Sequence, residues 1–237
     1  ADKIRGAQLT AVKDPNLILS LSGKSAGVQV NKNSSGAGAS AKVSIRGVRS
    51  VASDNQPLYV VDGMPILNST PEQAYSAIGG VADAGNRDGG DGISNLNAED
   101  IESVSILKGA PAAALYGSQA ANGVILITTK RAKQGSVTAN YTGEFSFETV
   151  RKYPELLSSS EYIEYGLGED YGADTDWYKE LTNDAPFSQR HTVSIAGGTE
   201  VGQVYTSFMA QNQKGIVIGD NRKDYSGRCL LYTSPSP

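Results

Sequence analysis

The stretch from Asp100 to Arg131, DIESVSILKGAPAAALYGSQAANGVILITTKR, decides the fold of this chain. Its first residues are mostly apolar and β-prone, and they predict a strand over 101–107 that stops at Lys108-Gly109. An alanine-rich segment follows and predicts a helix, with Pro111 in the first turn, where a missing N–H is tolerated. The segment therefore begins as a strand followed at once by a short helix.

The second half of this stretch predicts a turn and another strand. Gly117 can end the helix just after Tyr116, and Asn122-Gly123 is a dipeptide typical of tight turns. Residues 124–129, VILITT, form a continuous β-prone apolar run, which is typical of a strand buried on both faces. Strand, helix, turn and strand in such close succession predict that a small compact domain ends here.

The composition limits the classes of protein to be considered. The chain has 237 residues, of which 39% are hydrophobic, so it is long enough for one or two domains with real cores. Its net charge of −4 and the lack of a basic run argue against nucleic acid as a partner. Cys229 is the one cysteine, which excludes an internal disulfide and a cysteine-based metal cluster. No segment approaches the ~20 apolar residues of a membrane-spanning helix.

A regular alternation of apolar and polar residues begins after Gly135. Odd positions from Val137 to Thr149 are mostly apolar or small, and even positions are polar. The mean strand of a soluble protein has only ~5–6 residues. A strand that crosses a membrane needs ~9–11, with one face toward lipid. The length of the alternation therefore favours a transmembrane β-strand.

One long excursion and two further strands are predicted beyond this point. Residues 151–187 are polar and tyrosine-rich, which predicts a long loop with a short helix after Ser158. Residues 190–196 and 202–213 predict two more strands joined by a hairpin turn. In the second of these strands, Tyr205 and Phe208 are candidates for aromatic residues at the membrane interface.

The segment 100–131 resembles the end of the plug domain of TonB-dependent outer-membrane transporters, and most closely their SusC-like (SusC/RagA type) branch. Three other segments match this branch in the same order: residues 19–30 (LSLSGKSAGVQV), 43–48 (VSIRGV) and 57–66 (PLYVVDGMPI). The resemblance implies an α+β plug domain over residues 1–131, with a small mixed sheet and short helices. It implies that residues 136–227 form the first antiparallel strands and the first long loop of a transmembrane β-barrel.

The resemblance also implies a function. SusC-like transporters import glycans or peptides across the outer membrane without making or breaking a bond in the cargo, and the plug gates the barrel lumen. Their partners are TonB and a SusD-like surface lipoprotein, and no cofactor is implied. TonB binds a periplasmic N-terminal segment, which we expect to precede Ala1, because no signal peptide opens the chain.

Two other classes of function stay open from the residues alone. A soluble β-rich binding module of the cell envelope would bury the odd-numbered face of residues 136–213 in a closed core. An enzyme acting on polysaccharide would need a pair of well-placed carboxylates in a cleft, and no such pair stands out. His191 is the one histidine and lies in an alternating strand without a nucleophile pattern, so a surface or lumen-facing role is favoured over catalysis.

The plug motifs supply the candidate site residues. These are Arg46, Gly47, Asp62, Gly63, Tyr116, Gly117, Asn122 and Gly123. Asp62 follows a buried-looking strand and Arg46 precedes a glycine, so either could be half of a plug–barrel ion pair that must break during transport. A turn-capping aspartate and a surface arginine are an equally good interpretation. Tyr116 is expected to pack rather than to contact a ligand.

A glycine-rich loop could hold a metal ion. It carries four residues with oxygen ligands that could bind calcium: Asp83, Asn86, Asp88 and Asp91. Their spacing is not that of an EF-hand and lacks its closing glutamate, so a solvated loop is favoured. The resemblance places this loop in the plug, where it can face the transported solute.

The C-terminal residues do not fit the pattern of the preceding strands. Residues 228–237, RCLLYTSPSP, resemble the translation of sequencing-adapter DNA. We expect them to be foreign to the protein and not to continue the strand that begins near Tyr225. The alternative is a disordered native terminus rich in serine and proline.

Overall fold

The N-terminal half of the chain folds around a mixed β-sheet. The structure is a computed structural model, and it describes residues 2–11, 14, 16–32, 38, 40–47, 55–66, 92–169, 171–172 and 175–233. Within these residues the sheet has five strands in the order β1 (Asp2–Arg5), β6 (Ile101–Leu107), β7 (Val124–Thr129), β4 (Leu58–Val61) and β5 (Met64–Ile66). β4 and β7 are parallel, whereas the other pairs are antiparallel. The predicted mixed sheet is therefore confirmed.

Short helices and a hairpin surround this sheet. In the described residues they are α1 (Gly6–Leu9), α3 (Ala110–Tyr116), the 3-10 helices η1 (Leu19–Leu21), η2 (Ala98–Asp100) and η3 (Gly117–Ala120), and the hairpin of β2 (Val28–Lys32) and β3 (Ala41–Ile45). Together with the mixed sheet they form the domain that we call the plug, residues 2–131. No helix in the described part of the chain is long and apolar enough to cross a membrane.

The segment between β6 and β7 has the predicted strand, helix, turn and strand. α3 (Ala110–Tyr116) ends where Gly117 adopts a φ of +64°. Gly123 adopts a φ of +97°, and a Cβ there would lie 2.9 Å from Ile45 Cδ1 and 3.1 Å from the Leu107 carbonyl oxygen. A side chain at position 123 would therefore meet both backbone strain and a steric clash.

Apolar side chains from the mixed sheet fill the core of the plug. Ile106 and Ile125 face each other across β6 and β7, and both are fully buried. A smaller cluster includes Ala112 and Val124, and Tyr116 packs against it as predicted. The plug thus has one large buried apolar cluster and a smaller second one, as expected of a folded domain.

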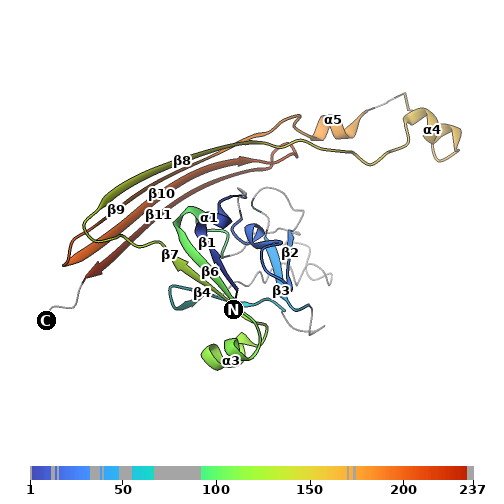
Figure 1. The fold of residues 1–237 in the computed structure, drawn as a ribbon. Helices are drawn as coiled ribbons and strands as arrows, with labels where there is room; N and C mark the ends of the chain where they lie inside the picture. Colours follow the sequence, from blue (N-terminus) through green and yellow to red (C-terminus); the bar gives the residue numbers. More distant parts are fainter. Residues whose placement is uncertain are drawn as a thin grey trace, which may run out of the picture.

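Long antiparallel strands follow the plug and form a second sheet. In the described residues they are β8 (Val137–Phe147), β9 (Phe187–Gly198), β10 (Gly202–Lys214) and β11 (Asn221–Thr233), in the spatial order β11-β10-β9-β8. They have 11, 12, 13 and 13 residues, about twice the mean strand length of soluble proteins. Figure 1 shows this sheet, which we call the wall sheet, curving over one side of the plug.

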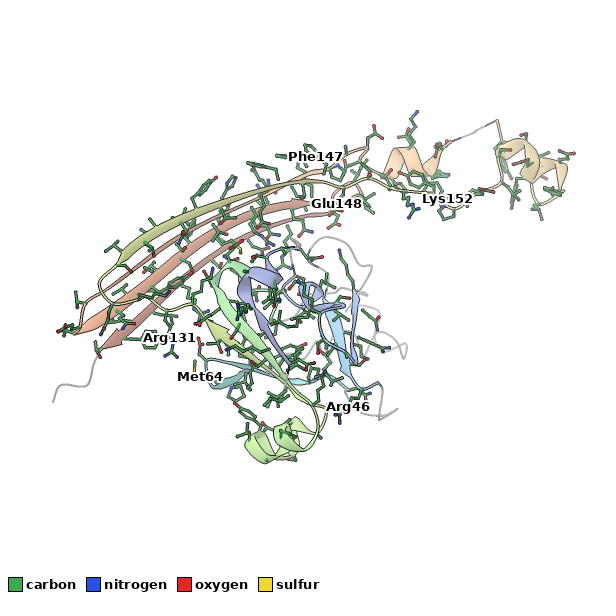
Figure 2. All side chains as sticks on the ribbon, viewed as in Figure 1. Arg46, Met64, Arg131, Phe147, Glu148 and Lys152 are labelled. Atoms are coloured by element: carbon green, nitrogen blue, oxygen red, sulfur yellow. The ribbon has the colours of Figure 1, made fainter. Side chains whose placement is uncertain are left out.

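The wall sheet carries its apolar side chains on the face turned away from the plug. On this outer face Phe147 is 68% exposed (Figure 2), and Val137, ten residues earlier on the same odd-numbered side of β8, is 81% exposed. Other large exposed side chains on the outer face are Tyr141, Phe145, Val193, Ile195, Phe208, Tyr225 and Leu231. The face toward the plug carries polar residues such as the buried Arg190 and Thr192. The soluble-module alternative requires the opposite, because it buries the odd-numbered face of β8 and β9.

The connections of the wall sheet differ in length at its two ends. Residues 148–186 join β8 to β9 and include α4 (Ser159–Glu164) and α5 (Trp177–Leu181). Ser158 caps α4, because its hydroxyl accepts the Glu161 N–H and the Glu161 carboxylate accepts the Ser158 N–H. The predicted helix after Ser158 is thus confirmed. At the other end, residues 199–201 alone join β9 to β10.

The expected interfacial position of Tyr205 is wrong. Tyr205 is only 4% exposed and faces the plug, whereas Phe208 lies on the outer face. The cause is the register of β10, which pairs Phe208 with Val193 of β9 and so turns its even-numbered residues outward.

The expected end of β11 before Arg228 is also wrong, because the strand continues to Thr233. Half-buried residues at 228, 230 and 232 alternate with exposed residues at 229, 231 and 233. This alternation fits a strand with one face toward the plug, and the backbone pairs with β10 throughout. That residues 228–237 are foreign to the protein stays a prediction.

Candidate functional site

The contact between the plug and the wall sheet is the candidate functional site, and it begins at the turn after β4. Asp62 adopts a φ of +49° there, a left-handed conformation that aspartate tolerates better than most residues, and Gly63 follows with a φ of +89°. The turn directs the Asp62 carboxylate onto β7. Its Oδ1 accepts the Thr129 N–H at 2.9 Å, and its Oδ2 accepts the Thr129 hydroxyl at 2.6 Å.

The same carboxylate forms an ion pair with the wall sheet. Arg228 of β11 donates from Nη2 to Asp62 Oδ2 at 2.9 Å and to Thr129 Oγ1 at 3.1 Å. The Asp62 side chain is only 12% exposed, so water screens this pair less than a surface pair. Of the two residues predicted as halves of a plug–barrel ion pair, Asp62 is therefore the one that makes such a contact.

Arg46 lies away from the wall sheet, at the far side of the plug in Figure 2. Its backbone N–H donates to the Gly27 carbonyl at 2.8 Å, and it adopts a φ of +62° beside Gly47 at +82°. Its guanidinium lies next to Gly109, where a Cβ would approach Nη1 to 2.9 Å. Arg46 and Gly47 thus shape a turn within the plug.

A second carboxylate of the plug is buried against the wall sheet. Asp100 is 5% exposed and lies where η2 meets β6. Its Oδ1 accepts the Tyr205 hydroxyl at 2.8 Å, and its Oδ2 accepts the Ser207 hydroxyl at 2.6 Å, both from β10. A buried carboxylate needs such donors. The burial of Asp100 therefore requires that β10 present Tyr205 and Ser207 at this position. Sequence reasoning missed Asp100, whose one signal is a charged residue directly before a buried strand.

Two further contacts extend this polar interface. The Asn97 side chain donates to Thr192 Oγ1 at 3.3 Å. The Arg131 guanidinium lies over the Tyr232 ring, 4.6 Å from its centroid, close to the connection from β7 to β8 over residues 130–136. Apart from the stacking of Arg131 on Tyr232, these contacts are hydrogen bonds and an ion pair, whose groups can bind water when the two parts separate.

The other predicted residues lie apart from this interface. Gly117, Asn122 and Gly123 shape the turn into β7, where Asn122 donates to the Gln56 carbonyl at 3.5 Å. His191 lies on the outer face of the wall sheet, with Nδ1 2.8 Å from the Tyr141 hydroxyl.

The predicted calcium ligands lie outside the described residues: Asp83, Asn86, Asp88 and Asp91. Within the described part of the chain, no group of histidine, cysteine, aspartate and glutamate side chains could hold a metal ion.

Comparison with known proteins identifies the class that this fold and interface define. Residues 1–124 match the family model of the TonB-dependent receptor plug domain. The chain belongs to the family of TonB-dependent receptors.

Its sequence relatives place it in the SusC-like branch. It is 38% identical over 223 residues to TonB-dependent receptor SusC of Bacteroides thetaiotaomicron, and the aligned region covers 90% of this chain and 21% of that protein. It is 34% identical over 231 residues to TonB-dependent receptor P26 of Formosa agariphila, and the aligned region covers 89% of this chain and 21% of that protein. The chain thus spans about a fifth of the length of these curated relatives. They are receptors and not enzymes.

Solved structures share the fold of both the plug and the wall sheet. The RagAB peptide importer in its closed-closed state superposes with a TM-score of 0.79, at 23% identity, over 99% of this chain and 29% of that chain. The siderophore receptor PirA from Pseudomonas aeruginosa superposes with a TM-score of 0.57, at 17% identity, over 100% of this chain and 32% of that chain.

Proposed function

We propose that this chain forms the plug and the first wall strands of a transporter that imports a glycan or peptide nutrient across the outer membrane. One observation carries the proposal. The plug buries its apolar side chains and contacts the wall sheet through polar groups, whereas the wall sheet exposes its apolar side chains on the opposite face. This arrangement suits a gate inside a membrane barrel. The likeness to relatives named TonB-dependent receptors supports TonB as the source of energy.

The wall sheet has the dimensions for this role. Its strands have 11 to 13 residues, enough for the ~9–11 that cross a bilayer, and their outer faces expose the side chains that lipid would cover. Outer-membrane barrels have short periplasmic turns and long extracellular loops. Residues 148–186 therefore lie outside the cell in this proposal, and residues 199–201 lie in the periplasm.

The interface of plug and wall sheet explains how the gate can move. Solute can pass only if the plug shifts relative to the wall, and the hydrogen bonds of Asp100 to Tyr205 and Ser207 must then break. Because these groups are polar, water entering the lumen replaces the lost contacts. An apolar interface would have no such replacement.

Two partners complete the proposal. TonB pulls a periplasmic segment of the receptor, and a SusD-like lipoprotein covers the outer mouth of the barrel. The likeness to SusC supports the lipoprotein partner. Cargo is a glycan or a peptide, and the likeness to the RagAB peptide importer shows a shared fold rather than a shared cargo.

The test is to lock the plug to the wall in the full-length protein. In a Cys229→Ser background, Asp100→Cys combined with Ser207→Cys is joined by a short bifunctional maleimide, with the two single-cysteine variants as controls. We expect cargo uptake by cells to need TonB, and to stop in the cross-linked double variant alone. Uptake that continues without TonB, or with the plug cross-linked, would contradict the proposal.

A further inference from the structure

The outer face of the wall sheet carries charged side chains at one end only. Odd-numbered residues form this face along β8, β9 and β11, and even-numbered residues form it along β10. Its residues that are charged at neutral pH are Lys214, which ends β10, and Lys223, near the start of β11, and both are exposed. In the orientation proposed above, this is the extracellular end of the strands. The outer face is therefore cationic at that end and uncharged along the rest of its length.

The two lysines are neighbours on adjacent strands. Lys214 pairs with Asn221, and Lys223 pairs with Asn212, so the lysines occupy diagonal positions on the same face of the sheet. Residues in such positions lie roughly 7–8 Å apart, and the flexible lysine stems can bring both ammonium groups to one anion. Each ammonium has three N–H donors. The pair can therefore hold a phosphate group from two sides.

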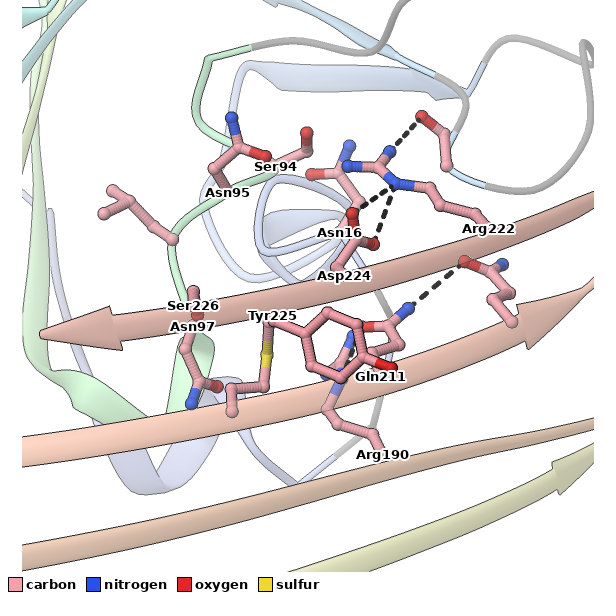
Figure 3. Close-up of a pocket in the computed structure, with 14 residues that line it drawn as sticks. Asn16, Ser94, Asn95, Asn97, Arg190, Gln211, Arg222, Asp224, Tyr225 and Ser226 are labelled. Atoms are coloured by element: carbon pink, nitrogen blue, oxygen red, sulfur yellow. Dashed lines mark hydrogen bonds and ion pairs between the residues drawn. The ribbon is translucent and has the colours of Figure 1, made fainter.

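The lysines lack the carboxylate partners that charged residues of the inner face have. On that face Arg222, the residue before Lys223, lies with its Nε 2.8 Å from Asp224 Oδ2 (Figure 3). Lys214 and Lys223 form no ion pair within the described part of the chain. Two neighbouring cations repel each other. An anion bound between them would remove this repulsion.

The lysines also lie at the level expected for lipid headgroups. Tyr225, the next outward residue after Lys223, is 72% exposed. Phe145 and Phe187 stack at the same end of β8 and β9, with ring centroids 6.0 Å apart. Such aromatic residues flank the apolar band of outer-membrane barrels. From Lys223 to Leu231 the strand rises roughly 27 Å, and a tilt of 35–45° reduces this to about 20 Å across the membrane, close to the ~25 Å of that band.

We propose that Lys214 and Lys223 bind the phosphate of an anionic lipid in the outer leaflet. The inference rests on the proposed function, because it requires the outer face to lie in the outer membrane. A lipid fits better than free phosphate, since the aromatic and apolar residues that follow the lysines on this face would cover its acyl chains. The bound lipid would hold the wall sheet at a fixed depth in the membrane while the plug moves.

The test measures lipid binding to the full-length protein in neutral detergent by native mass spectrometry. The probe is monophosphoryl lipid A, and the same lipid without its phosphate is the reference. The parent should bind the phosphorylated lipid on the order of 25-fold more tightly, about fivefold for each lysine near the anion. Lys214→Gln and Lys223→Gln should each weaken binding about fivefold. Lys32→Gln makes the same change at an exposed position of β2 in the plug and should bind like the parent.

The outcomes separate this inference from the proposed function. Equal binding of the two lipids overturns the inference, and so does parent-like binding by the folded double variant of Lys214→Gln and Lys223→Gln. Displacement of the lipid by millimolar inorganic phosphate, but not by chloride at the same ionic strength, would show a site for a free anion and also overturn it. TonB-dependent uptake of cargo together with any of these results would leave the proposed function standing.

Discussion

The plug and the wall sheet use the same residue types in opposite ways. Ile125 of β7 is fully buried in the plug, whereas Ile195 of β9 is 53% exposed on the outer face of the wall sheet. Both lie in β-strands with apolar neighbours. In the function proposed above, the difference is the medium that each surface faces, since the plug needs an apolar interior in water and the wall needs an apolar exterior in lipid. The number of apolar residues in a strand therefore does not distinguish a core strand from a wall strand. The burial or exposure of those residues does.

Separate expression of the two regions should show the largest effect. Residues 1–131 should be soluble and monomeric, because their apolar side chains are buried. Residues 1–227 should need detergent, because the outer face of the wall sheet is exposed. Ultracentrifugation with and without detergent measures this. Equal solubility of both would contradict the assignment of the wall.

Truncating a core isoleucine of the plug should have the next largest effect. Ile125→Ala in residues 1–131 should lower the free energy of unfolding by about 2–5 kcal/mol, because it leaves a cavity in a close-packed core. Leu115→Ala is the control, since Leu115 is 67% exposed, and it should change stability by less than about 0.5 kcal/mol. Urea denaturation measures both, and similar losses would show that the core of the plug is misplaced.

Glycine replacement at the turn before β7 should cost somewhat less. Gly123→Val should lower the stability of residues 1–131 by about 1–3 kcal/mol from backbone strain alone, with a further loss from the clash with Ile45 and Leu107. Gly117→Val is the matched control, because Gly117 also has a positive φ but a Cβ added there would meet nothing within 4 Å. The melting temperature should fall more for Gly123→Val, and an unchanged value would show that the turn is wrong.

The smallest effect should come from the exposed edge of the plug. Lys108 and Ser25 hydrogen-bond to the Asp2 carboxylate, each at 2.6 Å, and hold the pKa of Asp2 below its usual range. The stability that this gives is present above the ordinary pKa of about 4 and is lost as pH falls through the lowered pKa. Asp2→Asn and Lys108→Met should each flatten the decline of the urea midpoint between about pH 5 and pH 2. A decline as steep as the parent's in both variants would contradict this role.

Local rules were enough to predict much of the plug. The strand, helix, turn and strand of residues 100–131 follow from periodicity, proline position and turn glycines within one short segment. β1 was missed because three of the four residues of Asp2–Arg5 are charged and the segment is a strand only through its pairing with β6. Strand formation that depends on a distant partner leaves little signal in its own residues.

The interface could be predicted only in part. The sequence indicated that Asp62 or Arg46 could pair with the barrel, but geometry alone shows which one does. Asp100 and Tyr205 meet across 105 positions of sequence, and their contact depends on the register of β10 and on how the two regions pack. Neither is encoded in a local pattern, so the sequence left the facing of this strand open and offered Tyr205 and Phe208 alike as interfacial aromatics.

The connection between β7 and β8 sets a limit on the movement of the gate. From Thr129 to Val137 the chain can span at most roughly 25–30 Å when fully extended. β7 is the central strand of the plug, hydrogen-bonded to both β6 and β4. In the transporter proposed above, the end of β7 therefore stays within that distance of the start of β8 in every opened state. A plug that moves as a whole must pivot about this tether, which also keeps it attached to the wall sheet.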